Sequence, residues 1–279
     1  MLDEVSPDLV SIILPDAAHV GPTLQVLNAG MHVLAEKPLA MDRVDAERLL
    51  EAARRNGARF GINFNHRYST PFRRAKQVVS EGALGPAAYV LWKFTGGHFP
   101  ERHPPLHHLL YMQSHGFDML RWMGGPIRDV GCMASDPPSD GSLTTAVVSL
   151  TFESGAVGAL IASVDGAYAD TSTHEFEAIG LGGRVRVTDV LRRFEWSPRG
   201  ERTHVAVWEP GFFDDDERSF AATPARRIDA VVKAQLAGAP VPVPAEDGYH
   251  ALRAGLAAIA SAGSERRVAL AGRYEDGSA

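Results

Sequence analysis

The chain has 279 residues, of which 45% are hydrophobic and 22% are charged, an ordinary balance for one large or two medium-sized folded domains. Its formal net charge of −6 gives no electrostatic basis for binding nucleic acid or an anionic membrane. No apolar run approaches the roughly 18 residues that span a bilayer, and the acidic start Met1-Leu2-Asp3-Glu4 is unlike a signal peptide. A single cysteine, Cys132, excludes an intramolecular disulfide and suits a reducing compartment, so we expect a cytoplasmic protein.

A strand–helix–strand pattern opens the chain. Residues 9–14 and 32–34 are apolar runs that predict strands, and the residues from Asp16 to about Gly30 predict a helix between them. Two strands joined by a helix form a parallel βαβ unit, and open parallel sheets bind ligands at the carboxyl ends of their strands. Lys37 falls at such an end and is therefore a candidate functional residue.

The pattern of strand and helix continues after this lysine. A helix is predicted between Asp42, a suitable N-cap, and Gly57, which ends it. Its expected apolar stripe consists of Val44, Leu49, Leu50 and Ala53. Residues 60–64 predict a third strand and residues 73–81 a further helix.

From about residue 87 onward, short strands follow one another. They are predicted at residues 89–94, 129–133, 146–152, 157–162, 175–179, 184–188 and 204–208. Glu153-Ser154-Gly155 is a hairpin signal, and short connections of this kind favour antiparallel neighbours. Further helices are predicted at residues 109–123, 224–236 and 247–262. We therefore expect an α/β fold, with an incomplete Rossmann-like parallel domain in residues 1–66 and an α/β domain with a large, mostly antiparallel open sheet in residues 67–279.

Several segments share the order and spacing of one known family. They are Pro7-Asp8-Leu9-Val10-Ser11-Ile12, Pro15-Asp16 with His19, Ala29-Gly30-Met31-His32-Val33-Leu34-Ala35-Glu36-Lys37-Pro38-Leu39-Ala40, Asn63-Phe64-Asn65-His66-Arg67-Tyr68, Glu81-Gly82-Ala83-Leu84-Gly85, His115-Gly116-Phe117-Asp118 and residues 251–262. Together they resemble the Gfo/Idh/MocA oxidoreductases, relatives of glucose–fructose oxidoreductase and inositol dehydrogenase. The Glu-Lys-Pro run is the specific part of the resemblance, which covers essentially the whole chain.

The resemblance implies hydride transfer between NAD or NADP and a sugar, cyclitol or related polyol. It places Lys37 beside the nicotinamide and the substrate, where an ammonium can stabilise a developing alkoxide, and it implies that the bond to Pro38 is often cis. It implies that His115 takes the hydroxyl proton, typically a contribution of about 10²–10⁴-fold. The cofactor contacts that it implies are at Pro15, His19, Glu36, Lys37 and Pro38.

His115 lies within the predicted helix at residues 109–123, so a hydrogen-bonded histidine between helix and sheet is the alternative interpretation. The family usually has an acidic residue four positions before this histidine, and here that position is Tyr111. A phenol can position a sugar hydroxyl, but it cannot stabilise an imidazolium as a carboxylate does.

Five of the eleven histidines cluster in one stretch: His98, His103, His107, His108 and His115. His103 and His107 have the spacing of a helical metal-binding pair, but Pro104-Pro105 would break that helix, and Glu101 is the only acid close by. We therefore predict no metal site. We expect instead a polar loop in which His107 and Tyr111 bind hydroxyl groups of the substrate.

Arg67 follows Asn63 and Asn65 at the edge between the two predicted domains. It is a candidate for binding substrate, whether a carboxylate, a phosphate or a hydroxyl group. An ion pair between the domains is an equally weighted alternative.

No Gly-x-Gly-x-x-Gly turn, which holds the cofactor pyrophosphate in dinucleotide-binding domains, occurs in the sequence. Losing three charge-assisted hydrogen bonds at about 1.5–3 kcal/mol each would weaken the binding of a cofactor from a micromolar dissociation constant to roughly a millimolar one or weaker. We therefore expect weak or absent NAD(P) binding by this chain. Either the true start lies upstream, or the chain is a remnant whose open sheet edge is covered by a partner or by another copy.

The remnant interpretation leaves a second function open, a non-catalytic sugar-binding or scaffold subunit of the same fold. The resemblance also implies a homo-oligomer, because the large sheet commonly forms dimer interfaces in the family. The alternating faces of this sheet need cover on both sides if Val147, Leu150, Leu160 and Ile161 are to be buried.

Overall fold

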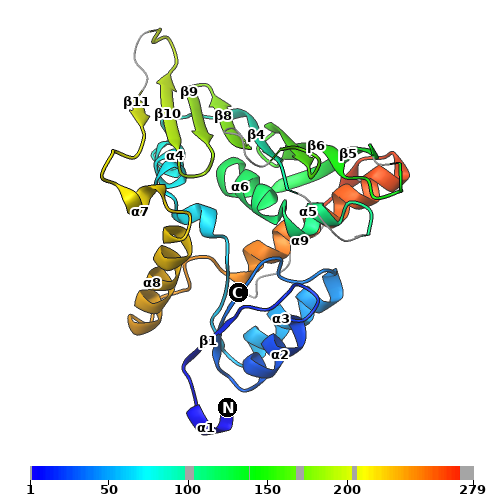
Figure 1. The fold of residues 1–279 in the computed structure, drawn as a ribbon, viewed down its shortest axis with the longest axis vertical. Coiled ribbons are helices and arrows are strands. Elements are labelled where there is room, and N and C mark those ends of the chain that lie inside the picture. Colours follow the sequence, from blue (N-terminus) through cyan, green and yellow to red (C-terminus); the bar gives the residue numbers. More distant parts are fainter. Residues whose placement is uncertain (1, 98–103, 138, 168–172, 203–205, 271–279) are drawn as a thin grey trace.

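The computed structural model describes residues 2–97, 104–137, 139–167, 173–202 and 206–270. Two sheets, one small and parallel, the other large and mostly antiparallel, organise the fold, and one continuous apolar core runs between them and their helices (Figure 1). The α/β fold class is therefore confirmed. His98, Glu101 and His103, which entered the metal-site argument, lie outside the described residues, as does the start of the strand expected at residues 204–208.

The small sheet consists of β1 (Leu9–Ile12), β2 (His32–Ala35) and β3 (Phe60–Ile62), in that order and all parallel. The connecting helices are α2 (Val20–Asn28) and α3 (Arg43–Arg55), so the predicted βαβ unit is confirmed. Asp42 caps α3 as expected, its side chain accepting from the Asp45 amide at 2.9 Å. Two details were wrong: α2 begins at Val20 and not at Asp16, and Val44 is 64% exposed, so the buried stripe of α3 starts at Ala46.

The large sheet has nine strands within the described residues. They are β4 (Ala87–Thr95), β5 (Ile127–Ser135), β6 (Thr145–Phe152), β7 (Val157–Ser163), β8 (His174–Gly180), β9 (Gly183–Thr188), β10 (Arg193–Pro198), β11 (Ala206–Trp208) and β12 (Val268–Ala269). Their spatial order is β11-β10-β9-β8-β4-β7-β6-β5-β12. All neighbours are antiparallel except β4 and β7, which are distant in sequence and pair in parallel. Neither that pair nor strands β10 and β12 were predicted.

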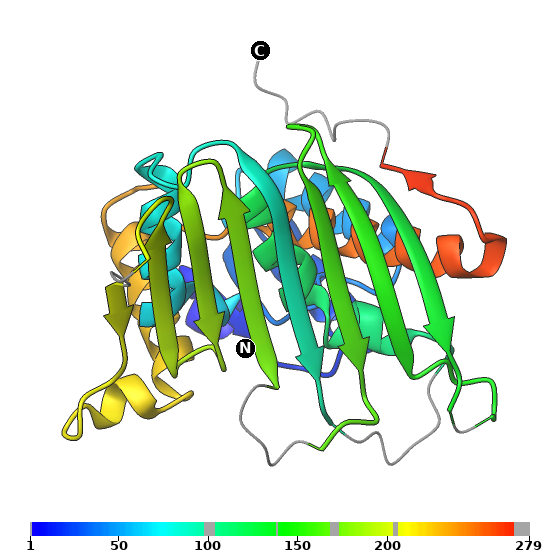
Figure 2. The same ribbon diagram turned by 90° about the horizontal axis from the view of Figure 1, so that it is seen from above.

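Helices cover one face of the large sheet, whereas its other face carries no described element (Figure 2). The covering helices are α4 (Thr70–Ser80), α5 (His107–Tyr111), α6 (Ser114–Gly124) and α9 (Ala245–Ser264). The single helix predicted at residues 109–123 is divided after Tyr111. At the break, the buried side chain of Gln113 accepts from Trp92 Nε1 and donates to the Phe94 carbonyl oxygen, both at 3.1 Å, which anchors the turn to β4.

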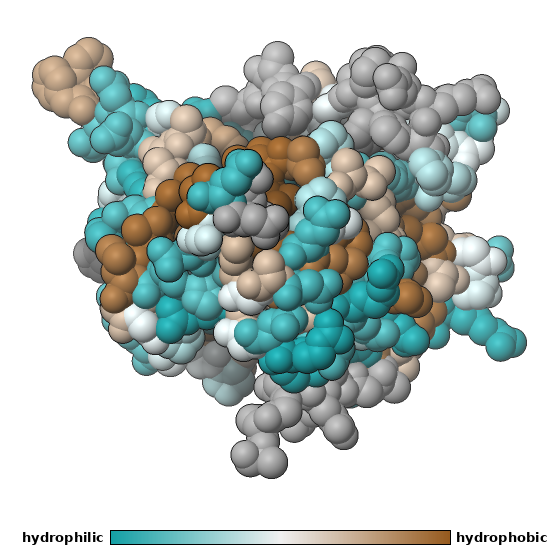
Figure 3. Space-filling model, turned by 90° about the horizontal axis from the view of Figure 1, so that it is seen from below, coloured by the Kyte–Doolittle hydropathy of each residue, from teal (hydrophilic) through white to brown (hydrophobic). Residues whose placement is uncertain are grey.

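Helix α8 (Ala222–Leu236) lies against the small sheet. Its buried stripe of Thr223, Arg227 and Val231 faces inward, and Gln235 near its end accepts from Arg59 at 2.9 Å. The remaining short elements are α1 (Leu2–Val5), the 3₁₀ helix η1 (Asn65–Tyr68) and α7 (Asp215–Arg218). Figure 3 shows the molecule from below the view of Figure 1, where apolar patches lie between hydrophilic ones.

Candidate active site

Lys37 lies at the carboxyl end of β2, and its peptide bond to Pro38 is cis, as the resemblance implied. Its Nζ donates to the carbonyl oxygen of Tyr111 at 3.0 Å and lies 4.1 Å from the centroid of the Tyr111 ring. Burial lowers the pKa of this ammonium from its usual 10.5, while Glu36 and Asp16 oppose that change. The parallel sheet thus directs a partly buried ammonium against the start of the second region of the chain.

His115, the second residue of α6, stacks on His66 of η1 with ring centroids 4.0 Å apart and planes only 15° from parallel. Burial lowers the pKa of His115 well below 6.5, and the nearby His66, Lys37 and His174 lower it further. The pKa of His66 is also well below its usual value, mainly through burial and then through His174 and Lys37. Both imidazoles are therefore neutral at neutral pH, the form in which a histidine can accept a proton.

Tyr111 and His107, the predicted substrate residues of the polar loop, both lie near Lys37. The His107 ring lies 6.2 Å from the Tyr111 ring and almost parallel to it, and His107 Nε2 is 3.4 Å from Asp16 Oδ2. Tyr111 is 37% exposed, so its phenol is accessible to a ligand. His108 points elsewhere: it is buried, and burial lowers its pKa to about 4.

The predicted cofactor residues differ in accessibility. Glu36 is partly exposed and accepts a hydrogen bond from Asn63 Nδ2, while Pro15 is exposed and Pro38 is buried behind Lys37. His19 precedes α2 with only 1% of its surface exposed, and burial lowers its pKa. His19 therefore offers little surface to a cofactor, and the contacts of all five residues stay predictions.

Arg67 is held inside the protein by two carboxylates. Its Nε donates to Asp118 Oδ2 at 2.9 Å, its Nη2 pairs with the same carboxylate, and its Nη1 lies 2.9 Å from Asp247 Oδ2. Burial disfavours the charged form of Arg67, but the two carboxylates outweigh this effect and raise the pKa of Arg67. Burial raises the pKa of Asp118 to about 6, although the nearby Arg67 acts to lower it. The ion pairs present join Arg67 to two carboxylates within residues 67–279 and so do not bridge the two predicted domains, and a substrate contact stays an untested prediction.

Two residues near this site were not singled out from the sequence. His66 stood in a quoted segment without a role, although its ring touches the candidate base. Arg227 lay within a predicted helix, where nothing in the local pattern separates an inward-facing arginine from an outward-facing one.

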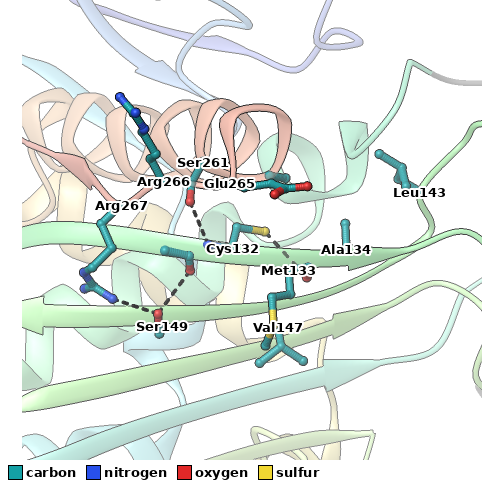
Figure 4. A pocket seen from close by; sticks show the side chains of 12 residues that line it. Cys132, Met133, Ala134, Leu143, Val147, Ser149, Ser261, Glu265, Arg266 and Arg267 are labelled. Carbon is teal, nitrogen blue, oxygen red and sulfur yellow. Dashed lines mark hydrogen bonds between the residues drawn. The ribbon is translucent and has the colours of Figure 1, made fainter.

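A cavity of about 590 Å³ lies between β5, β6 and the end of α9, and Lys37 does not line it (Figure 4). Its arginine Arg267 donates to Ser149 Oγ at 3.0 Å and to Asp129 Oδ1 at 2.6 Å. Burial raises the pKa of its thiol, Cys132, to about 11, so the sulfur stays protonated and unreactive. This cavity lacks the proton-transfer groups found around Lys37.

Within the described residues, no group of three or more His, Cys, Asp and Glu side chains is arranged to hold a metal ion. No helix in the same ranges is both long and apolar enough to cross a membrane.

Comparison with known proteins identifies the fold and the lineage. Residues 1–64 match a family model described as the oxidoreductase family with an NAD-binding Rossmann fold, and residues 103–270 match the C-terminal α/β domain of the same family. This chain belongs to the Gfo/Idh/MocA oxidoreductase family. The predictions of family and of an oxidoreductase lineage are thereby confirmed, and the non-catalytic alternative is not favoured.

The family members most similar in sequence include known dehydrogenases. The chain is 29% identical to the myo-inositol 2-dehydrogenase of Thermotoga maritima, over 97% of this chain and 82% of the relative. It is 38% identical to the D-glucoside 3-dehydrogenase of Escherichia coli over 30% of this chain and 24% of the relative. Among solved structures, levoglucosan dehydrogenase in complex with NADH and levoglucosan superimposes on this chain with a TM-score of 0.84 at 20% sequence identity. The superposition covers 97% of this chain and 82% of that one, and it supports the fold.

Proposed function

We propose that this protein is an NAD(P)-dependent dehydrogenase that oxidises a hydroxyl group of a sugar, cyclitol or related polyol. Its family and the named activities of its relatives support this proposal. The observation that carries it is the position of Lys37, whose ammonium is fixed on Tyr111 and is close enough to lower the pKa of His115. A cation that can stabilise an alkoxide and a neutral base that can take a proton are the two side-chain functions that assist hydride transfer from an alcohol.

Oxidation of an alcohol to a carbonyl removes a hydride and a proton, and the nicotinamide ring, when bound, supplies the hydride acceptor. Lys37 uses one N–H on the Tyr111 carbonyl and has two more to donate to the reacting oxygen, which stabilises the alkoxide. A ring nitrogen of neutral His115 takes the hydroxyl proton. Tyr111 and His107 orient the other hydroxyls.

The residues at the carboxyl ends of the parallel strands fit the reactive end of a dinucleotide. Glu36 and Lys37 are partly exposed there, and α2 begins nearby with no side-chain cap and no acidic residue in its first turn. Pro22 has no amide hydrogen and the Thr23 amide donates to the His19 carbonyl oxygen, so the amides of Val20 and Gly21 are the ones that can meet an anion. We propose that this single helix end, without a glycine-rich turn, holds NAD or NADP weakly.

The direct test is reduction of NAD⁺ or NADP⁺ at high cofactor concentration with a panel of sugars, cyclitols and acyclic polyols. Turnover of at least one neutral or acidic polyol, lost in Lys37→Met, is the expected result. Turnover unchanged in Lys37→Met would show that the oxidation uses other residues.

We further propose a homo-oligomer that covers the open face of the large sheet. Leu150 and Leu160 are buried beneath the helices, whereas Val147 is 40% exposed on the opposite face, where it pairs with Met133, which is 74% exposed. A second copy would remove this apolar surface from water.

We also propose that the protein works in the cytoplasm. The support is its lone cysteine, Cys132, a half-buried and protonated thiol that suits a reducing compartment.

A further inference from the structure

One buried cation near the candidate active site has no partner that explains it. Arg227 of α8 is 2% exposed, and its Nε and Nη1 have no hydrogen-bond acceptor among the described residues. Burial lowers its pKa, yet an arginine in a protein stays charged. Buried charged donors almost always have acceptors, so an exception points to a group that is not part of the chain.

The neighbours of Arg227 on α8 fix its place. One turn earlier, Thr223 Oγ1 accepts from Asn65 Nδ2 of η1 at 2.8 Å, and one turn later, Val231 lies over Leu9 and Val33 of the small sheet. Arg227 therefore lies above the carboxyl ends of the parallel strands, the end at which Lys37 leaves β2.

Two titratable side chains act on Arg227, those of Glu36 and Tyr68, and both are partly exposed. Glu36 already accepts from Asn63 and makes no hydrogen bond with the guanidinium. The hydroxyl of Tyr68 is also enclosed without a partner, and burial raises its pKa, so it stays a hydrogen-bond donor. The carbonyl oxygen of the Asn63 side chain is a third enclosed group without a partner.

We propose that Arg227 and Tyr68 form a subsite for an anionic oxygen group, a carboxylate or a phosphate, carried by the polyol substrate. The guanidinium and the phenol donate to the anion, while the Asn63 side-chain oxygen accepts from a neighbouring hydroxyl of the same ligand. Because Arg227 itself is 2% exposed, the ligand would approach it past Glu36 and Tyr68, the two partly exposed side chains that act on it. This inference rests on the proposed function, which it deepens: the substrate is an acidic sugar or a sugar phosphate, not a neutral polyol.

The test compares ligands that differ only in the anionic group. Titration calorimetry on the whole chain, with and without NADH, measures dissociation constants for three open-chain ligands: gluconate, glucitol 6-phosphate and glucitol. One charge-assisted interaction with arginine predicts that at least one of the two anions binds about 10- to 100-fold more tightly than glucitol. Whichever anion binds more tightly identifies the group as carboxylate or phosphate.

Three variants locate the preference on Arg227. Arg227→Met removes the charge at similar length and is expected to bring the anions within about twofold of glucitol, and Arg227→Lys is expected to keep part of the preference. The adjacent Arg226, paired with Glu217 at 2.6 Å, supplies the matched control: Arg226→Met is expected to keep the full preference. Thermal unfolding of Arg227→Met at no lower temperature than the parent would show that the arginine was not a structural partner.

Equal binding of both anions and glucitol, or a preference that survives Arg227→Met, would overturn this inference while leaving the proposed function intact. Weakened binding of NAD⁺ or NADP⁺ in Arg227→Met with unchanged anion preference would assign the guanidinium to the cofactor and also overturn it. If no polyol of either kind bound, the proposed function itself would fail.

Discussion

Lys37 contacts Tyr111 twice, through a hydrogen bond from Nζ to the carbonyl oxygen at 3.0 Å and through the ring, whose centroid is 4.1 Å from Nζ. This contact joins the end of β2 to the end of α5, and so links the parallel sheet to the helices under the large sheet. Tyr111 is also the position at which this chain departs from the acidic residue usual in its family. The departure therefore lies in direct contact with the candidate catalytic lysine, where it bears on the chemistry.

Replacing Lys37 by methionine should lower kcat/KM by roughly 10²- to 10³-fold, because the reacting oxygen loses its charged hydrogen-bond donor. Lys76 is a matched control, since its Nζ also donates to a backbone carbonyl, that of Trp122 at 2.6 Å, and also lies near that residue's ring. Steady-state kinetics of Lys76→Met should match the parent. Equal losses in the two variants would mean that the effect is structural.

The pH dependence of kcat/KM should show an acid limb below pH 6.5, the usual pKa of histidine, because burial lowers the pKa of His115 and only the neutral ring accepts a proton. Activity is lost as the pH falls through that lowered pKa. On the alkaline side, activity should be lost as the pH rises through the pKa of Lys37, because the charged ammonium is the useful form. Burial lowers this pKa, so the loss should begin at a lower pH than the usual 10.5 of a lysine would give.

Tyr111 offers a check on this assignment. In Tyr111→Asp, a carboxylate near both groups should raise their pKa values and move both limbs of the profile to higher pH. Tyr111→Phe, which adds no charge, should leave the limbs in place. An acid limb that stays at the same pH in Tyr111→Asp would argue against His115 as the titrating base.

Removing one carboxylate from the Arg67 ion pair should destabilise the fold. Asp118 is 2% exposed, and Asp118→Asn leaves a buried guanidinium with only Asp247, so we expect the free energy of unfolding to fall by about 3 kcal/mol. The exposed pair of Asp229 and Lys233 is the control, because Asp229→Asn should change it by less than about 1 kcal/mol. Urea unfolding of both variants measures the difference, and a loss below 1 kcal/mol for Asp118→Asn would mean that the network is not needed.

Local patterns predicted most of the helices and strands, because burial of one face imposes a period on the residues. They could not predict the parallel pairing of β4 with β7, since strand order depends on contacts between segments far apart in the chain. Strand β10 does alternate, with Phe194 and Trp196 between polar residues, but it is short and ends at Pro198, and it was not recognised from the sequence. The break after Tyr111 was missed because it depends on Gln113 reaching two residues of β4.

The candidate site was predictable to the extent that it follows strand ends and family segments. Lys37, His115 and Tyr111 were singled out in this way and stay candidates, and the structure brings Lys37 into contact with Tyr111. Arg67 was left between two roles, because a sequence does not show which carboxylates reach it. His66 and Arg227 were missed because only the tertiary fold turns them toward the site.

The open face of the large sheet should hold two copies together. Val147→Asp would place a charge in that interface, so we expect the parent to scatter light as an oligomer at micromolar concentration and the variant as a monomer. Leu236→Asp is the control, because Leu236 is 83% exposed at the end of α8, away from this sheet face. A parent that is a stable monomer at micromolar concentration would contradict the proposed assembly.

Residues 1–279 should bind NADH or NADPH with a dissociation constant of roughly a millimolar, because the free amides at the start of α2 replace only part of a pyrophosphate-binding turn. Lys37 contacts only the reactive end of the cofactor, so Lys37→Met should change this affinity little. Titration calorimetry, or the fluorescence of the reduced cofactor, measures both values. A dissociation constant in the low micromolar range would contradict this expectation and show that this chain holds the phosphates firmly without a glycine-rich turn. Substituting Val20 by proline, which removes one of those amides, would then test α2 first.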